Sequence, residues 1–68
     1  MHKFYFVNNL MDDNGDHEVH TLDCNHLPNT ERTLVGWFDN CEDAVKAAKK
    51  FYLNSNGCYW CSRSCHTS

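Results

Sequence analysis

The chain has 68 residues, five of them cysteine, and a formal net charge of −3. That length suits one domain, residues 1–68, and so small a domain buries only about 60% of the surface that its unfolded chain exposes. Domains of this size are often stabilised by a metal or by disulfides. Hydrophobic residues make up 41% of the chain, too many for a disordered protein. The acidic balance disfavours a general nucleic-acid binder, which is normally basic.

The N-terminus shows no targeting signal. Only four apolar residues, 4–7, follow Met1-His2-Lys3, and this run is too short for a signal-peptide core or a membrane span. We therefore expect a cytoplasmic protein that does not enter a membrane. In that compartment the five cysteines are expected to stay reduced and to bind metal rather than to pair as disulfides.

Two strands are predicted in the first third of the chain. Residues 3–8 are aromatic and β-branched and show no helical period, which predicts a strand. The polar stretch 8–15 ends in Asn14-Gly15, a strong turn signal. Residues 16–21 alternate, so that Glu18 and His20 share one face and Val19 lies on the other. The two strands are expected to form a hairpin.

A third strand and a helix are predicted next. Residues 24–33 hold the only proline, Pro28, and form an irregular connection. Residues 34–38 read as a strand with a possible bulge at Gly36. Asp39 or Asn40 then caps a helix over residues 41–53. The apolar stripe of this helix consists of Cys41, Ala44, Val45, Ala48, Phe51 and Tyr52.

The strongest motif lies after this helix, in Gly57-Cys58-Tyr59-Trp60-Cys61. Two thiols at this spacing can bind one metal ion, and Gly57 is expected to permit the tight turn. A tetrahedral zinc site needs two further ligands, and His20 and Cys24 offer them at a similar short spacing. We therefore predict zinc bound by His20, Cys24, Cys58 and Cys61. A structural zinc contributes about 10–16 kcal/mol in small domains, so folding is expected to depend on it.

The predicted fold is α+β: a short antiparallel sheet of about three strands, one helix and a C-terminal metal-binding tail. Alternatives to the ligand set stay open. Cys65 or His66 could replace one ligand, join Cys58 and Cys61 in a wholly C-terminal site, or bind a second metal. A redox pair of Cys58 and Cys61 is disfavoured because no helix begins at the motif.

Ordinary structural roles are predicted for the remaining side chains. Cys41 is predicted to be a small core residue. His26 is expected to be a surface residue or to orient a ligand. Lys46, Lys49 and Lys50 are expected to form a solvated helix surface. The larger aromatic residues are predicted to be core and metal-site cover, namely Trp37, Phe38, Phe51, Tyr59 and Trp60.

The order of these motifs resembles the metal-binding domain of Ada, the bacterial DNA-methylphosphotriester repair protein, and the small Ada-like zinc modules. The similarity runs from Val19 to Cys61. It rests on Val19-His20-x3-Cys24, on Gly36-Trp37-Phe38-Asp39, on Asp43-Ala44 and on Gly57-Cys58-x-x-Cys61. The resemblance implies the scaffold and the zinc site.

In Ada four cysteines hold the zinc, and the first of them accepts a methyl group from DNA. The corresponding position here is His20, whose lone pair would be engaged by the metal, so methyl acceptance is not expected there. We therefore expect a monomeric zinc module that binds a protein partner, with nucleic acid a less favoured partner, rather than an enzyme. The alternatives are an alkyl acceptor that uses Cys24, Cys58 or Cys61, and a metal sensor or store.

Overall fold

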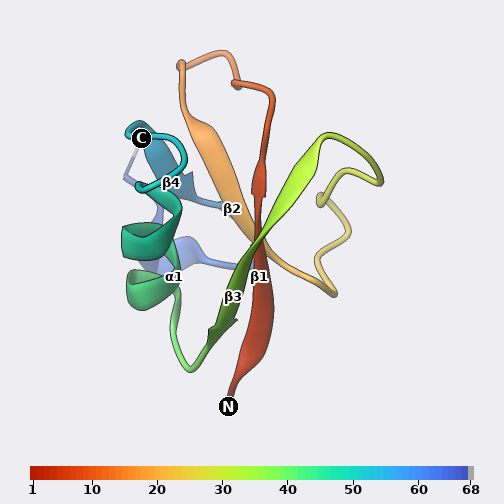
Figure 1. The fold of residues 1–68 in the computed structure, drawn as a ribbon, viewed down its shortest axis with the longest axis vertical. Coiled ribbons are helices and arrows are strands. Elements are labelled where there is room, and N and C mark those ends of the chain that lie inside the picture. The colour runs from red at the N-terminus through yellow and green to blue at the C-terminus, as the bar shows by residue number, and fades with distance from the viewer. Residues whose placement is uncertain (68) are drawn as a thin grey trace.

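The computed structural model describes residues 1–67 as a four-stranded sheet with one α-helix packed against it (Figure 1). The strand order is β3-β1-β2-β4. The elements are β1 (Lys3–Asn8), β2 (His17–Thr21), β3 (Arg32–Phe38), α1 (Cys41–Ala48), β4 (Ser55–Gly57) and the 3₁₀-helix η1 (Arg63–Cys65). The first three strands pair antiparallel, as predicted. The fourth, β4, was not predicted, and it pairs parallel to β2, so the sheet is mixed.

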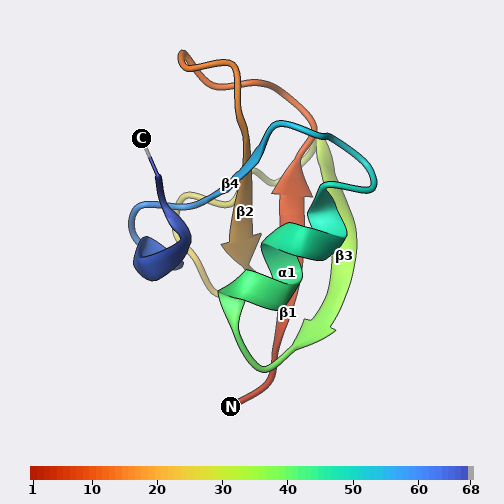
Figure 2. The same ribbon diagram turned by 90° about the vertical axis from the view of Figure 1, so that its left-hand side faces the viewer.

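The hydrophobic core lies between α1 and one face of this sheet (Figure 2). Alternation along β1 and β2 directs Tyr5, Val7 and Val19 toward the helix. Ala44 and Ala48 on α1 are fully buried against them. Small helix residues opposite larger strand residues bring the helix close to the sheet, which suits a chain that has few residues to bury.

The helix begins where predicted and ends earlier. Asn40 is the N-cap, and its side-chain oxygen accepts a hydrogen bond of 2.8 Å from the backbone N–H of Asp43. The helix ends at Ala48, because the N–H groups of Lys50 and Phe51 bond to carbonyls three residues earlier in a tighter turn. Phe51 is consequently exposed, and the prediction of a helix to residue 53 with Phe51 on its buried face was wrong.

A bulge in β3 changes which residues face outward. Tyr5 pairs with Gly36 and Phe6 pairs with Leu34, so one extra residue of β3 lies next to Gly36, as the sequence suggested. Beyond the bulge Trp37 lies opposite Phe4 on the face away from the helix, with ring centroids 4.6 Å apart. Trp37 remains 56% exposed, so its assignment to the core was wrong.

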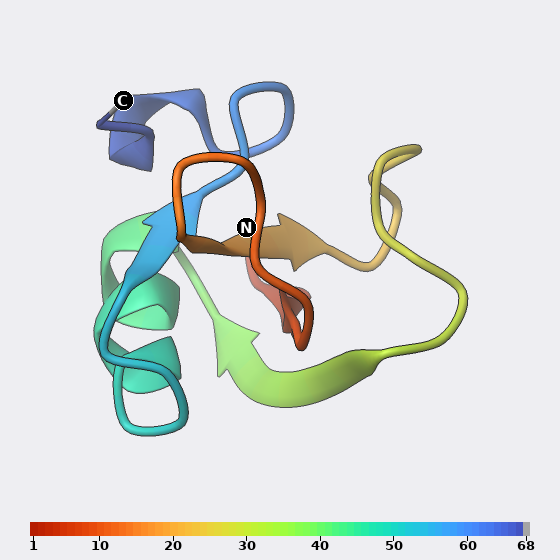
Figure 3. The same ribbon diagram turned by 90° about the horizontal axis from the view of Figure 1, so that it is seen from above.

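A disulfide joins Cys41, the first residue of α1, to Cys65, the last residue of η1. Cys41 is buried, as predicted, but the expectation that all five cysteines are reduced was wrong for this pair. The bond holds the C-terminal tail on the β4 side of the sheet, away from β3 (Figure 3). Among residues 1–67, no helix has the length and apolar character needed to cross a membrane.

Candidate metal centre

Parallel pairing of β2 and β4 sets the position of the candidate site. Val19 pairs with Gly57, and the N–H of Cys58 donates to the carbonyl of Val19 at 3.0 Å. Residues that follow paired positions in parallel strands lie side by side at the same end of the sheet. His20 and Cys58, the next residues along the two strands, are therefore brought level with each other.

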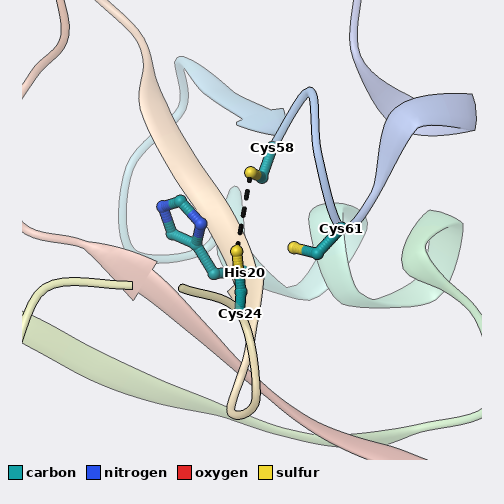
Figure 4. A group of neighbouring side chains, drawn as sticks. All are labelled: His20, Cys24, Cys58 and Cys61. Atoms are coloured by element: carbon teal, nitrogen blue, oxygen red, sulfur yellow. Dashed lines mark hydrogen bonds between the residues drawn. The ribbon is translucent and has the colours of Figure 1, made fainter. Parts of the chain in front are cut away.

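Two tight turns bring in the other two predicted ligands. The N–H of Cys24 bonds to the carbonyl of Thr21 at 3.1 Å, which folds the chain back just after β2. In the same way the N–H of Ser62 bonds to the carbonyl of Cys58 at 2.9 Å, which folds the chain back after β4. Ligand atoms of the four predicted residues consequently lie within 4.8 Å of one another (Figure 4), namely those of His20, Cys24, Cys58 and Cys61.

The geometry of this cluster fits a metal ion. Tetrahedral zinc with Zn–S bonds of about 2.3 Å places its sulfurs about 3.8 Å apart, and the sulfurs of Cys24 and Cys58 are 3.9 Å apart. His20 is 1% exposed, and neither of its ring nitrogens has a hydrogen-bond partner. A buried imidazole normally has such a partner. A metal ion at the centre of the cluster would supply it.

One side of the His20 ring faces a carboxylate. Its Nε2 atom lies 3.6 Å from Oε1 of Glu18, too far for a hydrogen bond but close enough for an electrostatic interaction. Figure 4 shows the other ring nitrogen directed toward the sulfurs. A histidine between a carboxylate and a metal is a common arrangement, in which the carboxylate fixes the ring orientation.

Backbone N–H groups point at all three sulfurs of the cluster. Each donates a hydrogen bond of 3.4 Å, from Thr21 to Cys61, from His26 to Cys24 and from Trp60 to Cys58. Hydrogen bonds to a thiolate favour its charged form. His26 thus contacts a predicted ligand through its backbone, while its ring stacks on Trp60 at 5.5 Å.

Without a metal the three thiols differ in acidity. Burial raises the pKa of Cys58 to about 12, and burial also raises the pKa of Cys24. Burial acts in the same direction on Cys61, but the adjacent His20 imidazole, the Ser62 hydroxyl and a backbone N–H outweigh it and lower the pKa of Cys61 to about 6. In the metal-free cluster Cys61 is therefore the most acidic of the three thiols, and a bound cation would be needed to ionise the other two at neutral pH.

Gly57 has a different role from the one predicted. It is the last residue of β4 and does not form a turn. A Cβ atom at this position would lie 2.6 Å from Cβ of Cys65 and 2.8 Å from the carbonyl oxygen of Ser62. Glycine is therefore required because the tail crosses directly over this strand.

The alternative ligands lie outside the cluster. Cys65 is bonded to Cys41, and Nδ1 of His66 lies 3.0 Å from the carbonyl oxygen of Gly57. Cys41, Glu42 and Cys65 also lie close together, but the two sulfurs are bonded to each other and offer no free thiolate. The structure therefore groups the four predicted residues and does not assemble a wholly C-terminal site.

The aromatic residues of the motif do not cover the site. Trp60 is 69% exposed, and Tyr59 also lies at the surface, so their prediction as metal-site cover was wrong. The guanidinium of Arg63 lies 4.8 Å from the centre of the Tyr59 ring. The rings of Tyr59 and Trp60, the two residues between Cys58 and Cys61, are thus exposed to solvent.

Sequence reasoning missed three features that build the site: strand β4, the N–H groups directed at the sulfurs, and Glu18. A signal for Glu18 was present, because the alternation of residues 16–21 already placed it on the same face as His20. The other two depend on backbone positions that no side-chain pattern records.

Comparisons with protein-family models, with curated protein sequences and with solved structures gave no match to this chain.

Proposed function

We propose that this protein is a zinc-binding module whose ion is structural and is held by His20, Cys24, Cys58 and Cys61. The observation that carries the proposal is the buried His20 ring, which has no hydrogen-bond partner and lies in a group of four ligand atoms within 4.8 Å of one another. Three sulfurs and one imidazole nitrogen suit zinc, which is commonly bound in tetrahedral sites of this composition.

The zinc would link the turn after β2 to the turn after β4, so that both halves of the chain contribute two ligands. Glu18 would accept a hydrogen bond from the outer nitrogen of the His20 ring and hold the ring in place. With four protein ligands no coordination position is left for a substrate, which is typical of structural sites and not of catalytic ones. We therefore favour a non-catalytic role.

The resemblance to the Ada metal-binding domain stays a prediction about scaffold and site. Two features speak against a methyl-acceptor role for this chain. In the predicted resemblance His20 corresponds to the acceptor cysteine, and Cys58 is 1% exposed and so lies away from an incoming alkyl group. Incubation with a methylating agent, followed by mass spectrometry, tests this point. Zinc-dependent methylation of a single cysteine would favour the acceptor.

Native mass spectrometry and cobalt substitution test the zinc site itself. We expect one metal ion per chain and, with Co²⁺, the absorption bands of a tetrahedral ion bound by thiolates. His20→Ala should lose the metal, whereas His2→Ala is a matched control and should retain it, because His2 lies outside the cluster with its ring stacked 5.9 Å from that of Trp37. If His20→Ala binds one Co²⁺ with an unchanged spectrum, the ligand assignment is wrong.

We further propose that the outer face of the sheet binds an apolar side chain of a protein partner. Phe4, Leu22 and Trp37 are exposed around a shallow pocket of about 220 Å³, which Lys3 and Asp23 complete. Lys3 and Asp23 lie 3.6 Å apart and largely neutralise each other. The pocket is thus apolar and carries little net charge, which favours a hydrophobic side chain over a phosphate group.

A cross-linking experiment with variants tests this surface. A protein captured by the wild type should be lost with Trp37→Ala and retained with Leu53→Ala, an exposed leucine outside this pocket. Loss with both variants or with neither would contradict the assignment of the pocket. Recovery of nucleic acid that depends on Lys46 and Lys49 would instead favour the helix surface and the alternative partner class.

A further inference from the structure

The Cys41–Cys65 disulfide and the proposed zinc site constrain the same segment of the chain. The disulfide closes a loop between residues 24 positions apart, and both Cys58 and Cys61 lie within this loop. The zinc would connect the same two cysteines to His20, outside the loop. The segment that carries half of the zinc ligands is therefore fixed from two sides, by the metal toward β2 and by the disulfide toward α1.

The tail that the disulfide anchors packs directly on β4. Cys65 lies against Gly57, where even one added carbon would be within 2.6 Å of its Cβ. Nδ1 of His66 lies 3.0 Å from the carbonyl oxygen of Gly57, and the N–H of Thr67 donates to Oδ1 of Asn56 at 3.1 Å. Because Cys58 follows Gly57, these contacts hold one zinc ligand in position.

One sulfur of the disulfide is open to a reductant. Cys41 is buried, but Cys65 is only partly buried and lines a shallow groove of about 280 Å³ between α1 and the tail. Lys46 and Lys49 line the same groove together with Glu42, whose carboxylate lies within 4.8 Å of both sulfurs, so the charged side chains of the groove sum to one positive charge. This net positive charge would attract a small anionic thiol, and the two ammonium groups would stabilise the thiolate that attacks.

We propose that the Cys41–Cys65 disulfide is a redox-controlled clasp that determines how long the zinc is retained, and that glutathione or a similar small anionic thiol opens it. This proposal rests on the zinc site proposed above. One thiolate attacks Sγ of Cys65 and displaces the Cys41 thiolate, which takes up a proton. A second thiolate then attacks the mixed disulfide and releases Cys65 as a thiol. Two reductant thiols are oxidised to one disulfide, and the protein disulfide is reduced.

Opening the clasp would leave the tail attached to β4 only by hydrogen bonds and packing. The segment between α1 and the tail would gain conformational freedom, and Cys58 and Cys61 would separate more readily from the ion. Zinc would still bind, because none of its four ligands is consumed. The reduced protein would therefore exchange zinc faster than the oxidised protein.

Zinc release into a chelating dye measures this effect directly. Oxidised wild type should release zinc slowly, and wild type treated with glutathione should release it at least about tenfold faster, as expected when a loop of this length opens. The double variant Cys41→Ser/Cys65→Ser should match the treated wild type. Glutathione should not accelerate release from the double variant, which controls for direct removal of zinc by the thiol.

Three results would overturn the inference: equal release rates in oxidised and reduced wild type, equal acceleration by glutathione in the double variant, or a zinc-loaded, air-oxidised wild type whose mass shows no disulfide. If the double variant fails to fold, the comparison of oxidised and reduced wild type decides alone. A failure of the zinc site is distinguishable, because then neither redox form binds zinc and the inference fails with it.

Discussion

Gly57→Ala is expected to destabilise the protein through a single methyl group. The added Cβ would lie 2.6 Å from Cβ of Cys65, 2.8 Å from the carbonyl oxygen of Ser62 and 2.9 Å from the carbonyl carbon of Cys65. Two of these atoms belong to the backbone, and the third belongs to a residue fixed by a disulfide. None of them can move away cheaply, so the cost should reach the upper end of the range for overpacking, about 3 kcal/mol.

The expected change in melting temperature follows from the size of the chain. For domains of 60–100 residues each kcal/mol lowers Tm by about 4–8 °C, so Gly57→Ala should lower Tm by about 12–24 °C. Circular dichroism of the zinc-loaded, oxidised protein measures this shift. Because the strained atoms lie beside Cys58, the variant should also release zinc faster than the wild type.

Gly15→Ala provides a matched control in the loop between β1 and β2. A Cβ at this glycine would have no neighbour within 4 Å, but the residue has a φ of 81°, so only backbone strain of about 1–2 kcal/mol is expected. Gly57→Ala should therefore be clearly the more damaging substitution. If it melts within about 3 °C of the wild type, the close packing of the tail on β4 is refuted.

Three further predictions concern the proposed zinc site. Cys58→Ser should abolish tight zinc binding and unfold the domain, because the ion would lose one of its four ligands and the domain would lose several kcal/mol of folding free energy. One-dimensional NMR with and without zinc measures this, and a folded variant with one bound zinc would contradict it. Glu18→Gln should weaken zinc affinity about tenfold by removing the carboxylate beside His20; competition with a chelator measures this, and Glu31→Gln, which is remote from the cluster, should have no effect. Zinc affinity should fall as the pH falls, because thiols must lose their protons to bind the ion, and burial raises the pKa of Cys24 and raises that of Cys58 to about 12. Competition with a chelator at pH 8 and pH 6 measures this, and an affinity that does not change with pH would contradict binding through thiolates.

Local patterns predicted most of the secondary structure because each pattern reflects burial on one face. Alternation identified the hairpin, and the helix start followed from the capping side chain of Asn40. Strand β4 could not be found in this way. Its sequence, Ser55-Asn56-Gly57, has poor strand propensity, and its conformation is imposed by pairing with β2 on one side and packing of the tail on the other.

The grouping of the four candidate ligands was predictable because each pair occupies a short turn, so its members stay together whatever the rest of the chain does. The disulfide was not predictable from spacing. Cys65 lies four residues after Cys61 and can equally be read as a metal ligand or as a partner for a distant thiol. Only the packing of η1 against the start of α1 distinguishes the two readings.

Exposure of the aromatic residues was the least predictable feature. Aromatic side chains are usually buried, and nothing in the sequence around Trp37 marks it as different. The bulge beside Gly36 decides its direction, because one extra residue reverses the face on which every later side chain of the strand lies.

The parallel pair of β2 and β4 also has a consequence for folding kinetics. The hairpin of β1 and β2 can form early, because its contacts are local, whereas β4 must return from beyond the helix to reach the edge of the sheet. The hairpin that forms first therefore carries His20 and Cys24, two of the four candidate ligands, before Cys58 and Cys61 have reached the edge of the sheet. In that interval the proposed zinc ion would meet only two of its four ligands, so tight binding of the ion and docking of β4 beside the hairpin would have to occur together.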